Sequence, residues 1–316
     1  MTWTAPTGAG APDVAREGSS ASNPNSSMNA SPSPVIDRFE VVAAYGTGIA
    51  ATSYAPAGEP DAVVLVVPAM GVSQSYYAEF AGWLAARDCL ALTFDYRGTG
   101  RSLHGPLRRA EADLVTWGRQ DCGAMLEAAA ARSGARPLLW IGHSLGGQLL
   151  PFVENLGRVS KVITVATGSG YWRENAPWLR SRAFWFWYVL VPLALLLFGC
   201  FPGRSLRMVG DLPRGVMTQW RRWCLHPKYA AGAEGDAVRA LFAAVRLPIV
   251  SLSFTDDEYM SARNVEAIHG QYTGAPVTFR RISPADVGVQ RVGHFGFFRA
   301  RLAATLWQDL LLPALR

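Results

Sequence analysis

A short glycine-rich turn constrains the fold of this chain more than any other feature of its sequence. The turn at 142–147 reads GHSLGG; it follows the apolar run 138–141 and precedes a helix-compatible segment, 148–155. A strand that enters a helix through so tight a turn holds its central residue in a strained conformation, with the side chain above the sheet edge. Glycines flank such a turn because a side chain there would collide with neighbouring backbone. Ser144 is therefore the candidate nucleophile.

Strand and helix patterns alternate along most of the chain. A continuous apolar run at 62–67 predicts a strand buried on both faces, and further strands are predicted at 90–94, 138–141, 159–166, 249–254 and 277–282. Helical patterns occupy 76–86, 110–132, 236–245, 264–272 and 297–312, and a hairpin at 38–44 and 49–55 precedes them all. This alternation predicts an α/β fold with a mostly parallel central sheet and helices on both faces. Sites in such sheets lie at the carboxyl ends of strands, which is where Ser144 falls.

The composition excludes several other classes of protein. The chain is 50% hydrophobic and 17% charged, which suits a large buried core. Its net charge of +6 comes from scattered arginines and forms no long basic run. We therefore expect no nucleic-acid partner and only a modest attraction to anionic surfaces. The four cysteines lack metal-ligand spacing, so we expect free structural thiols. We expect no metal and no organic cofactor, because the chemistry of a nucleophilic serine needs neither.

The composition also divides the chain into segments. Residues 1–35 are rich in Ala, Ser, Pro, Asn and Gly, which predicts a disordered leader. This stretch lacks the basic start and apolar run of a secretory signal, so we expect a cytoplasmic protein. Residues 36–169 and 233–316 form the predicted core, and residues 170–232 form a helical lid inserted into it.

A nucleophilic serine needs a base, and that base needs an acid to orient it. His294 lies in the glycine-flexed loop 293–296, between the last predicted strand and the last helix. Asp256 and Asp257 directly follow the strand at 249–254. Either aspartate could orient the imidazole, the other then serving as a solvated turn or helix cap. The order Ser, Asp, His is the one expected with a strand–turn–helix nucleophile.

An acyl-transfer mechanism also needs hydrogen-bond donors for the oxyanion. The backbone N–H of Leu145, at the start of the helix, is one candidate. The second should come from the loop after the strand at 62–67, whose sequence at 68–71 is PAMG. Its small and flexible residues suit a backbone that turns toward a ligand, and Met70 N–H is the predicted donor.

From residue 38 onward the chain resembles the α/β-hydrolase superfamily. The GHSLG of 142–146 resembles its nucleophile elbow, and the DYRGTGRS of 95–102 resembles the Arg-Gly-x-Gly-x-Ser turn that shapes the site. The PAMG of 68–71 occupies the place of the His-Gly oxyanion motif but lacks that pair. The acid turn of the superfamily, aligned on its strand, favours Asp257, although Phe254 and Ser261 replace its usual glycine and proline.

Within the superfamily the chain resembles serine esterases and lipases, and a bacterial branch of predicted hydrolases without an assigned substrate. The resemblance implies that Ser144 attacks a carbonyl, His294 carries the proton and Asp257 holds the imidazole. We therefore expect hydrolysis of a carboxylic ester or thioester with an apolar acyl group. Acyl transfer by the same triad and non-catalytic binding of a lipid or small molecule stay open as alternatives.

An uncharged apolar stretch at 183–201 interrupts the alternation. Its length would suffice to span a bilayer, which takes roughly 17–25 residues. However, Ser144 precedes it while Asp257 and His294 follow it, so a single crossing would separate nucleophile from base. We interpret the stretch as part of a lid, with Pro192 breaking or kinking its helix. It could pack on the main domain or in a homodimer, line an acyl-sized pocket, or make weak contact with a membrane surface.

Overall fold

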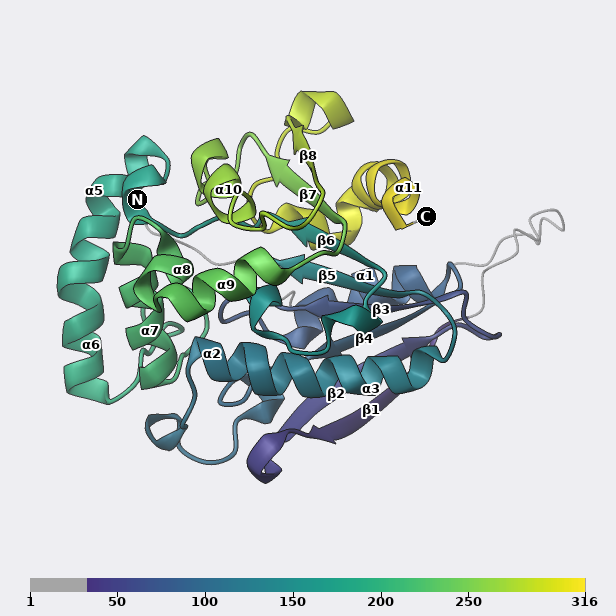
Figure 1. Ribbon diagram of the computed structural model, residues 1–316, viewed down its shortest axis with the longest axis horizontal. Coiled ribbons are helices and arrows are strands. Elements are labelled where there is room, and N and C mark those ends of the chain that lie inside the picture. Colours follow the sequence, from purple (N-terminus) through teal and green to yellow (C-terminus); the bar gives the residue numbers. More distant parts are fainter. Residues whose placement is uncertain (1–32, 316) are drawn as a thin grey trace, which may run out of the picture.

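The computed structural model describes residues 33–315 (Figure 1). The predicted disordered leader therefore lies almost wholly outside the described residues. Strand β1 begins at Val35, the last residue assigned to that leader. The predicted core thus starts one residue earlier than the sequence suggested.

One sheet of eight strands organises the molecule. Its order is β1-β2-β4-β3-β5-β6-β7-β8. The strands are β1 (Val35–Val42), β2 (Gly48–Ala55), β3 (Ala62–Val67), β4 (Cys89–Phe94), β5 (Leu138–His143), β6 (Lys161–Val165), β7 (Ile249–Phe254) and β8 (Val277–Ile282). Strand β2 pairs antiparallel with β1 and β4, and every other pairing is parallel. The predicted α/β fold with a mostly parallel sheet is confirmed.

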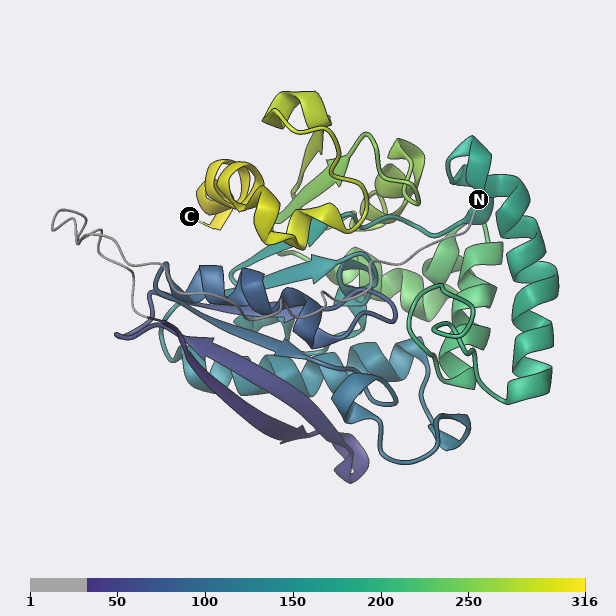
Figure 2. The same ribbon diagram turned by 180° about the vertical axis from the view of Figure 1, so that it is seen from behind.

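Helices cover both faces of this sheet (Figures 1 and 2). The face toward the viewer in Figure 1 carries α2 (Leu114–Thr116), α3 (Gly123–Ser133) and α9 (Asp236–Ala244). The opposite face carries α1 (Ala78–Ala85) and the C-terminal helical segment that ends in α11 (Leu312–Leu315). Each face has its own apolar core, built around large aromatic side chains such as Trp117 on one side and Phe80 on the other. Helix α10 (Ala262–His269) connects β7 to β8.

One predicted helix near the site differs from the observed structure. The helix after the turn is α4 (Leu145–Gln148), followed by a 3-10 turn at Leu150–Phe152, instead of one helix over 148–155. Pro151 lacks an N–H, so it cannot donate to the carbonyl four residues earlier. That carbonyl, of Gly147, accepts from the hydroxyl of Tyr272 at 3.2 Å instead.

Two other helix boundaries were also predicted imperfectly. The helix expected from residue 110 begins at Leu114, because the side chain of Asp113 accepts the Thr116 N–H at 2.7 Å and caps it. The closing helix expected over 297–312 is divided: 3-10 turns at Gly296–Phe298 and Ala300–Leu302 precede a π-helical segment at Ala303–Leu311. These turns use local hydrogen bonds that the apolar pattern does not reveal.

The segment predicted as a lid lies between β6 and β7 and is helical. Its elements are α5 (Pro177–Trp185), a π-helical turn (Phe186–Leu190), α6 (Val191–Phe198), α7 (Arg214–Leu225) and α8 (Tyr229–Ala233). The first three form one continuous helix of 22 residues, called here the 177–198 helix. Of the break or kink expected at Pro192, the break does not occur, and the helix instead carries a widened turn just before the proline. The wide turn just before Pro192 accommodates the missing N–H, and Arg221 Nε donates to the Trp187 carbonyl at 2.5 Å.

Candidate active site

Ser144 sits at the carboxyl end of β5, which lies between β3 and β6 in the sheet. Its backbone has φ 49° and ψ −109°, a conformation that residues other than glycine rarely adopt. The surroundings hold this strain in place. Ser144 N–H donates to the Val165 carbonyl at 2.8 Å, and its own carbonyl accepts from Thr167 Oγ1 at 3.0 Å. The chain therefore forms the strand–turn–helix that its glycines predicted.

The glycines of the turn are required by close backbone packing. A Cβ on Gly146 would lie 2.1 Å from the Val67 carbonyl oxygen, and one on Gly142 would lie 2.5 Å from the Gly147 nitrogen. Real Cβ atoms essentially never approach so closely. Helix α4 consequently packs directly on the end of β3, so that Leu145 lies beside the loop that follows β3.

His294 and Asp257 form a buried pair. His294 Nδ1 lies 2.8 Å from Asp257 Oδ2, which assigns the Nδ1 proton to this bond and leaves Nε2 as an acceptor. The other carboxylate oxygen of Asp257 accepts the N–H groups of Tyr259 and Met260 at 2.8 and 2.9 Å. Burial by itself lowers the pKa of His294, but the charges of Asp257 and Glu258 outweigh it, so the net pKa is raised above its usual value.

The neighbouring acids hold the backbone of the histidine loop. Asp256, the alternative acid, accepts the N–H groups of Val292 and Gly293 at 2.9 and 3.1 Å. Glu258 accepts the His294 N–H at 3.0 Å. The structure therefore pairs the His294 side chain with Asp257, while Asp256 and Glu258 fix the loop that carries it. No local sequence pattern indicates this role of Glu258.

Both predicted oxyanion donors lie in firmly held segments. The hydroxyl of Tyr96 donates to the Pro68 carbonyl at 2.9 Å, and the Ala69 N–H donates to the hydroxyl oxygen of Tyr77 at 2.9 Å. These bonds fix the backbone on the N-terminal side of Met70. Leu145 is the first residue of α4, so its N–H has no acceptor within that helix.

A chain of hydrogen bonds joins the oxyanion loop to the histidine loop. The Tyr77 hydroxyl lies 2.9 Å from His143 Nδ1, and His143 Nε2 lies 3.1 Å from the His294 carbonyl oxygen. A carbonyl only accepts, so Nε2 carries the proton and Nδ1 accepts from Tyr77. Burial, with a smaller effect from His294, holds the pKa of His143 well below its usual value, so the ring is neutral. No local sequence pattern indicates this role of Tyr77 and His143.

The site is covered. Ser144 and His294 are only 7% and 4% exposed. The segment after the 177–198 helix reaches the oxyanion loop, where Gly210 N–H donates to the Gly71 carbonyl at 3.2 Å. The rings of Tyr259 and Phe295 each lie 5.0 Å from the His294 ring.

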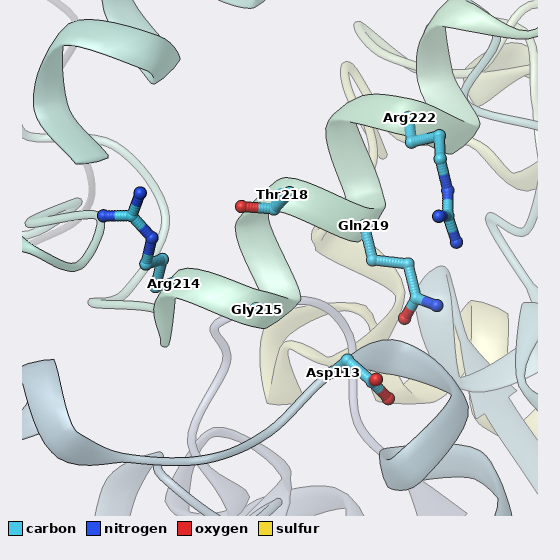
Figure 3. Close-up of a pocket in the computed structure, with 6 residues that line it drawn as sticks. All are labelled: Asp113, Arg214, Gly215, Thr218, Gln219 and Arg222. Carbon is cyan, nitrogen blue, oxygen red and sulfur yellow. The ribbon is translucent and has the colours of Figure 1, made fainter. Parts of the chain in front are cut away.

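A separate surface hollow of about 300 Å³ lies where α7 meets the start of α2 (Figure 3). It is lined by Asp113, Arg214, Gly215, Thr218, Gln219 and Arg222. Gln219 accepts the N–H groups of Leu114 and Val115 at 2.6 and 3.1 Å. This contact caps α2 and holds it against the inserted helices, which is a structural role.

Within residues 33–315 no group of three or more His, Cys, Asp or Glu side chains is placed to hold a metal ion.

A mostly parallel sheet that carries a strained serine after one strand and a histidine–aspartate pair after two others defines the α/β-hydrolase class. The family described as serine aminopeptidase, S33, matches residues 58–209, a range that contains Ser144 and ends before Asp257 and His294. This match spans just under half of the chain and, together with the α/β-hydrolase fold, it supports the α/β-hydrolase superfamily.

Solved structures share this fold at low sequence identity. A thermostable carboxyl esterase from Bacillus coagulans in complex with glycerol has a TM-score of 0.56 and 14% identity, over 78% of this chain and 90% of its own. A cold-adapted esterase from an Arctic intertidal metagenomic library has a TM-score of 0.52 and 16% identity, over 92% and 97%. The thioesterase domain from the curacin biosynthetic pathway has a TM-score of 0.51 and 14% identity, over 86% and 98%. No curated protein matches the chain.

Proposed function

We propose that this protein is a serine hydrolase that cleaves a carboxylic ester or thioester with an apolar acyl group. One observation carries the proposal: a serine held at positive φ after β5 shares a sheet edge with a buried His294–Asp257 pair. Strands β5, β7 and β8 belong to one parallel series, so their carboxyl ends meet at that edge. The carboxylate follows β7, and the imidazole follows β8.

In the proposed reaction Ser144 Oγ attacks the substrate carbonyl while His294 Nε2 accepts its proton. Asp257 holds the ring in the required tautomer and stabilises the imidazolium that forms. The N–H groups of Met70 and Leu145 donate to the oxyanion. His294 then returns the proton to the leaving group, and a water molecule releases the acyl group by the same steps. The raised pKa of His294 favours proton uptake, as this role requires.

The groups around the site favour an apolar acyl chain. Phe295 and Tyr259 flank His294, and the side chain of Val209 approaches Gly71 of the oxyanion loop. Because the inserted helices continue into this covering segment, we propose that residues 170–232 act as a lid that moves to admit substrate. The structural likeness to esterases and a thioesterase is consistent with this chemistry but extends only to the fold.

Acyl transfer to an alcohol or amine is a second candidate, because Ser144 and His294 are almost fully shielded from water. An acyl-enzyme protected in this way could await another acceptor. The two outcomes separate when free acid and transferred product are measured together in the presence of an added alcohol. Dominant transfer at low alcohol concentration would replace hydrolysis as the proposed function.

The test is a series of p-nitrophenyl esters of increasing acyl length, assayed on the parent protein, Ser144→Ala and Ser75→Ala. Ser75 is exposed, so it provides the same substitution away from the proposed site. We expect a preference for medium or long chains, a loss on the order of 10⁶-fold in kcat for Ser144→Ala, and unchanged turnover for Ser75→Ala. Full turnover by Ser144→Ala would overturn the proposal. Ligand binding without turnover in the parent would indicate a non-catalytic binder.

A further inference from the structure

The 177–198 helix exposes an unusual amount of apolar surface. The helix is long and apolar enough to cross a membrane, yet only 28% of its most apolar 18-residue stretch is buried. Of the sixteen large apolar side chains that the described residues expose, nine belong to it. These nine are Trp178, Phe184, Trp185, Tyr188, Val189, Leu193, Leu196, Leu197 and Phe198. So large a contiguous apolar surface marks a contact site.

Five of these nine exposed residues share one face of the helix. Trp178, Trp185, Val189, Leu193 and Leu196 recur at intervals of three, four or seven residues, which places them on one face. Leu196 is the most exposed, at 77%. This outward stripe runs along most of the helix.

The opposite face is fixed to the body of the protein. Ala183, Trp187, Val191 and Ala194 are buried there. Helix α7 secures it further, since Arg214 Nη1 donates to the Leu195 carbonyl at 3.0 Å. The helix therefore lies along the outer edge of the molecule, at the left in Figure 1 and at the right in Figure 2. A helix held along its length in this way presents one face to its surroundings and does not project away as a separate span.

The surroundings of this stripe are basic. No Asp or Glu occurs between Glu174 and Asp211, whereas this segment contains four arginines. Arg180 and Arg182 are exposed near the start of the helix, and Arg182 lies 5.2 Å from the centre of the Trp178 ring. Arg204 and Arg207, which follow the helix in the chain, are exposed as well. Arginines and tryptophans beside an apolar stripe are typical of helices that lie in a membrane interface.

We propose that the 177–198 helix docks flat on an anionic phospholipid surface, with its apolar stripe inserted among the acyl chains. A second copy of this chain is the less suitable occupant because of the same charges. Two-fold pairing brings the ends of identical helices together. In parallel pairing Arg180 and Arg182 would face the same arginines of the other copy, and in antiparallel pairing the segment 175–210 offers no acidic side chain to face them. Neither pairing complements these charges, whereas lipid phosphates do.

The test is sedimentation of the full-length protein with vesicles of phosphatidylcholine, with or without phosphatidylglycerol. The stripe variant carries three changes at exposed positions: Leu193→Ser, Leu196→Ser and Leu197→Ser. The control carries the same kind of change at exposed aliphatic residues of β1: Val35→Ser, Ile36→Ser and Val42→Ser. We expect the parent and the control to bind anionic vesicles, and the stripe variant to lose at least about tenfold in partitioning. Unchanged thermal unfolding confirms that each variant is folded.

A second pair of variants tests the charge. Arg180→Gln with Arg182→Gln should weaken binding by several-fold for each arginine removed, while Arg280→Gln with Arg281→Gln, which are exposed on β8, should not. Ser144→Ala should bind vesicles like the parent, so the result is independent of the proposed catalysis. The proposal is overturned if the parent ignores anionic vesicles, if stripe and control variants lose binding equally, or if the stripe changes instead dissolve a stable dimer.

Discussion

Substitution of Gly146 by alanine tests whether the packing of α4 on β3 positions the site. The added Cβ would lie 2.1 Å from the Val67 carbonyl oxygen, whereas ordinary contact begins at 3.4 Å. Helix α4 and the end of β3 would therefore have to separate by about 1.3 Å. That shift would move Ser144 and the Leu145 N–H away from the loop that carries Met70. A displacement of this size at a reacting centre costs about 100-fold in rate, and the overpacking itself costs about 1–3 kcal/mol of stability.

The assay combines urea unfolding with kcat/KM on an activated ester. Gly123→Ala is the matched control: Gly123 begins α3 with helical geometry and has nothing within 4 Å of the new Cβ. It should leave activity unchanged and stabilise the fold by about 0.5–1 kcal/mol. Opposite effects on stability from the same chemical change are the expected result. If Gly146→Ala kept both the activity and the stability of the parent, the close packing of α4 on β3 would not be what positions Ser144.

Three further substitutions test the contacts around the site. Asp257→Asn should lower kcat on the order of 10⁴-fold. The charge of Asp257 raises the pKa of His294, so its removal should shift the acidic limb of the remaining kcat/KM profile to lower pH. Tyr77→Phe leaves the Ala69 N–H without its acceptor, so urea unfolding should show a loss of about 1–3 kcal/mol, together with a lower kcat. Asp121 forms a buried 2.6 Å ion pair with Arg97 of the 95–102 turn. Burial outweighs the charge of Arg97 and raises the pKa of Asp121 to about 6 in the folded state, so the folded carboxyl binds its proton more tightly than the unfolded one. Measured against Asp121→Asn, the parent should therefore lose stability as pH rises from about 4 to about 6.

For each of these substitutions, a specific result would contradict the prediction. Asp256→Asn keeps an oxygen that can accept from the Val292 and Gly293 N–H groups, so it should retain most activity and the pH profile of the parent. If Asp256→Asn and Asp257→Asn lowered kcat equally, Asp257 would have no special role in orienting His294. A Tyr77→Phe protein with parental stability, or an Asp121→Asn protein whose stability follows pH like the parent, would contradict the corresponding argument.

Local sequence patterns predicted the architecture because the physical constraints behind them are local. A buried parallel strand must be apolar throughout, and a turn as close as that at 142–147 tolerates only glycine at its flanks. The class of fold, the strands and the strained serine followed from these constraints. The break expected at Pro192 did not occur, because the chain widens its helical turn and Arg221 donates to a carbonyl of that turn. Neither compensation leaves a signal near Pro192 in the sequence.

The finer arrangement of the site depends on long-range contacts. Two adjacent aspartates follow β7, and only the folded loop shows that Asp257 contacts the imidazole while Asp256 contacts backbone. Tyr77 and His143 are 66 residues apart in the chain, and the His143 ring contacts a carbonyl 151 residues away. No pattern within one segment predicts such a network. The cytoplasmic location and the lid role of residues 170–232 stay predictions.

Covalent labelling at Ser144 tests the central claim most directly. The folded protein is treated with a fluorophosphonate probe, and the modified residue is located by mass spectrometry of its peptides. A nucleophilic Ser144, activated by His294, should take up one probe at its Oγ, and both Ser144→Ala and prior unfolding should abolish the labelling. Labelling of other serines alone, or no labelling of the folded protein, would contradict the proposed serine hydrolase.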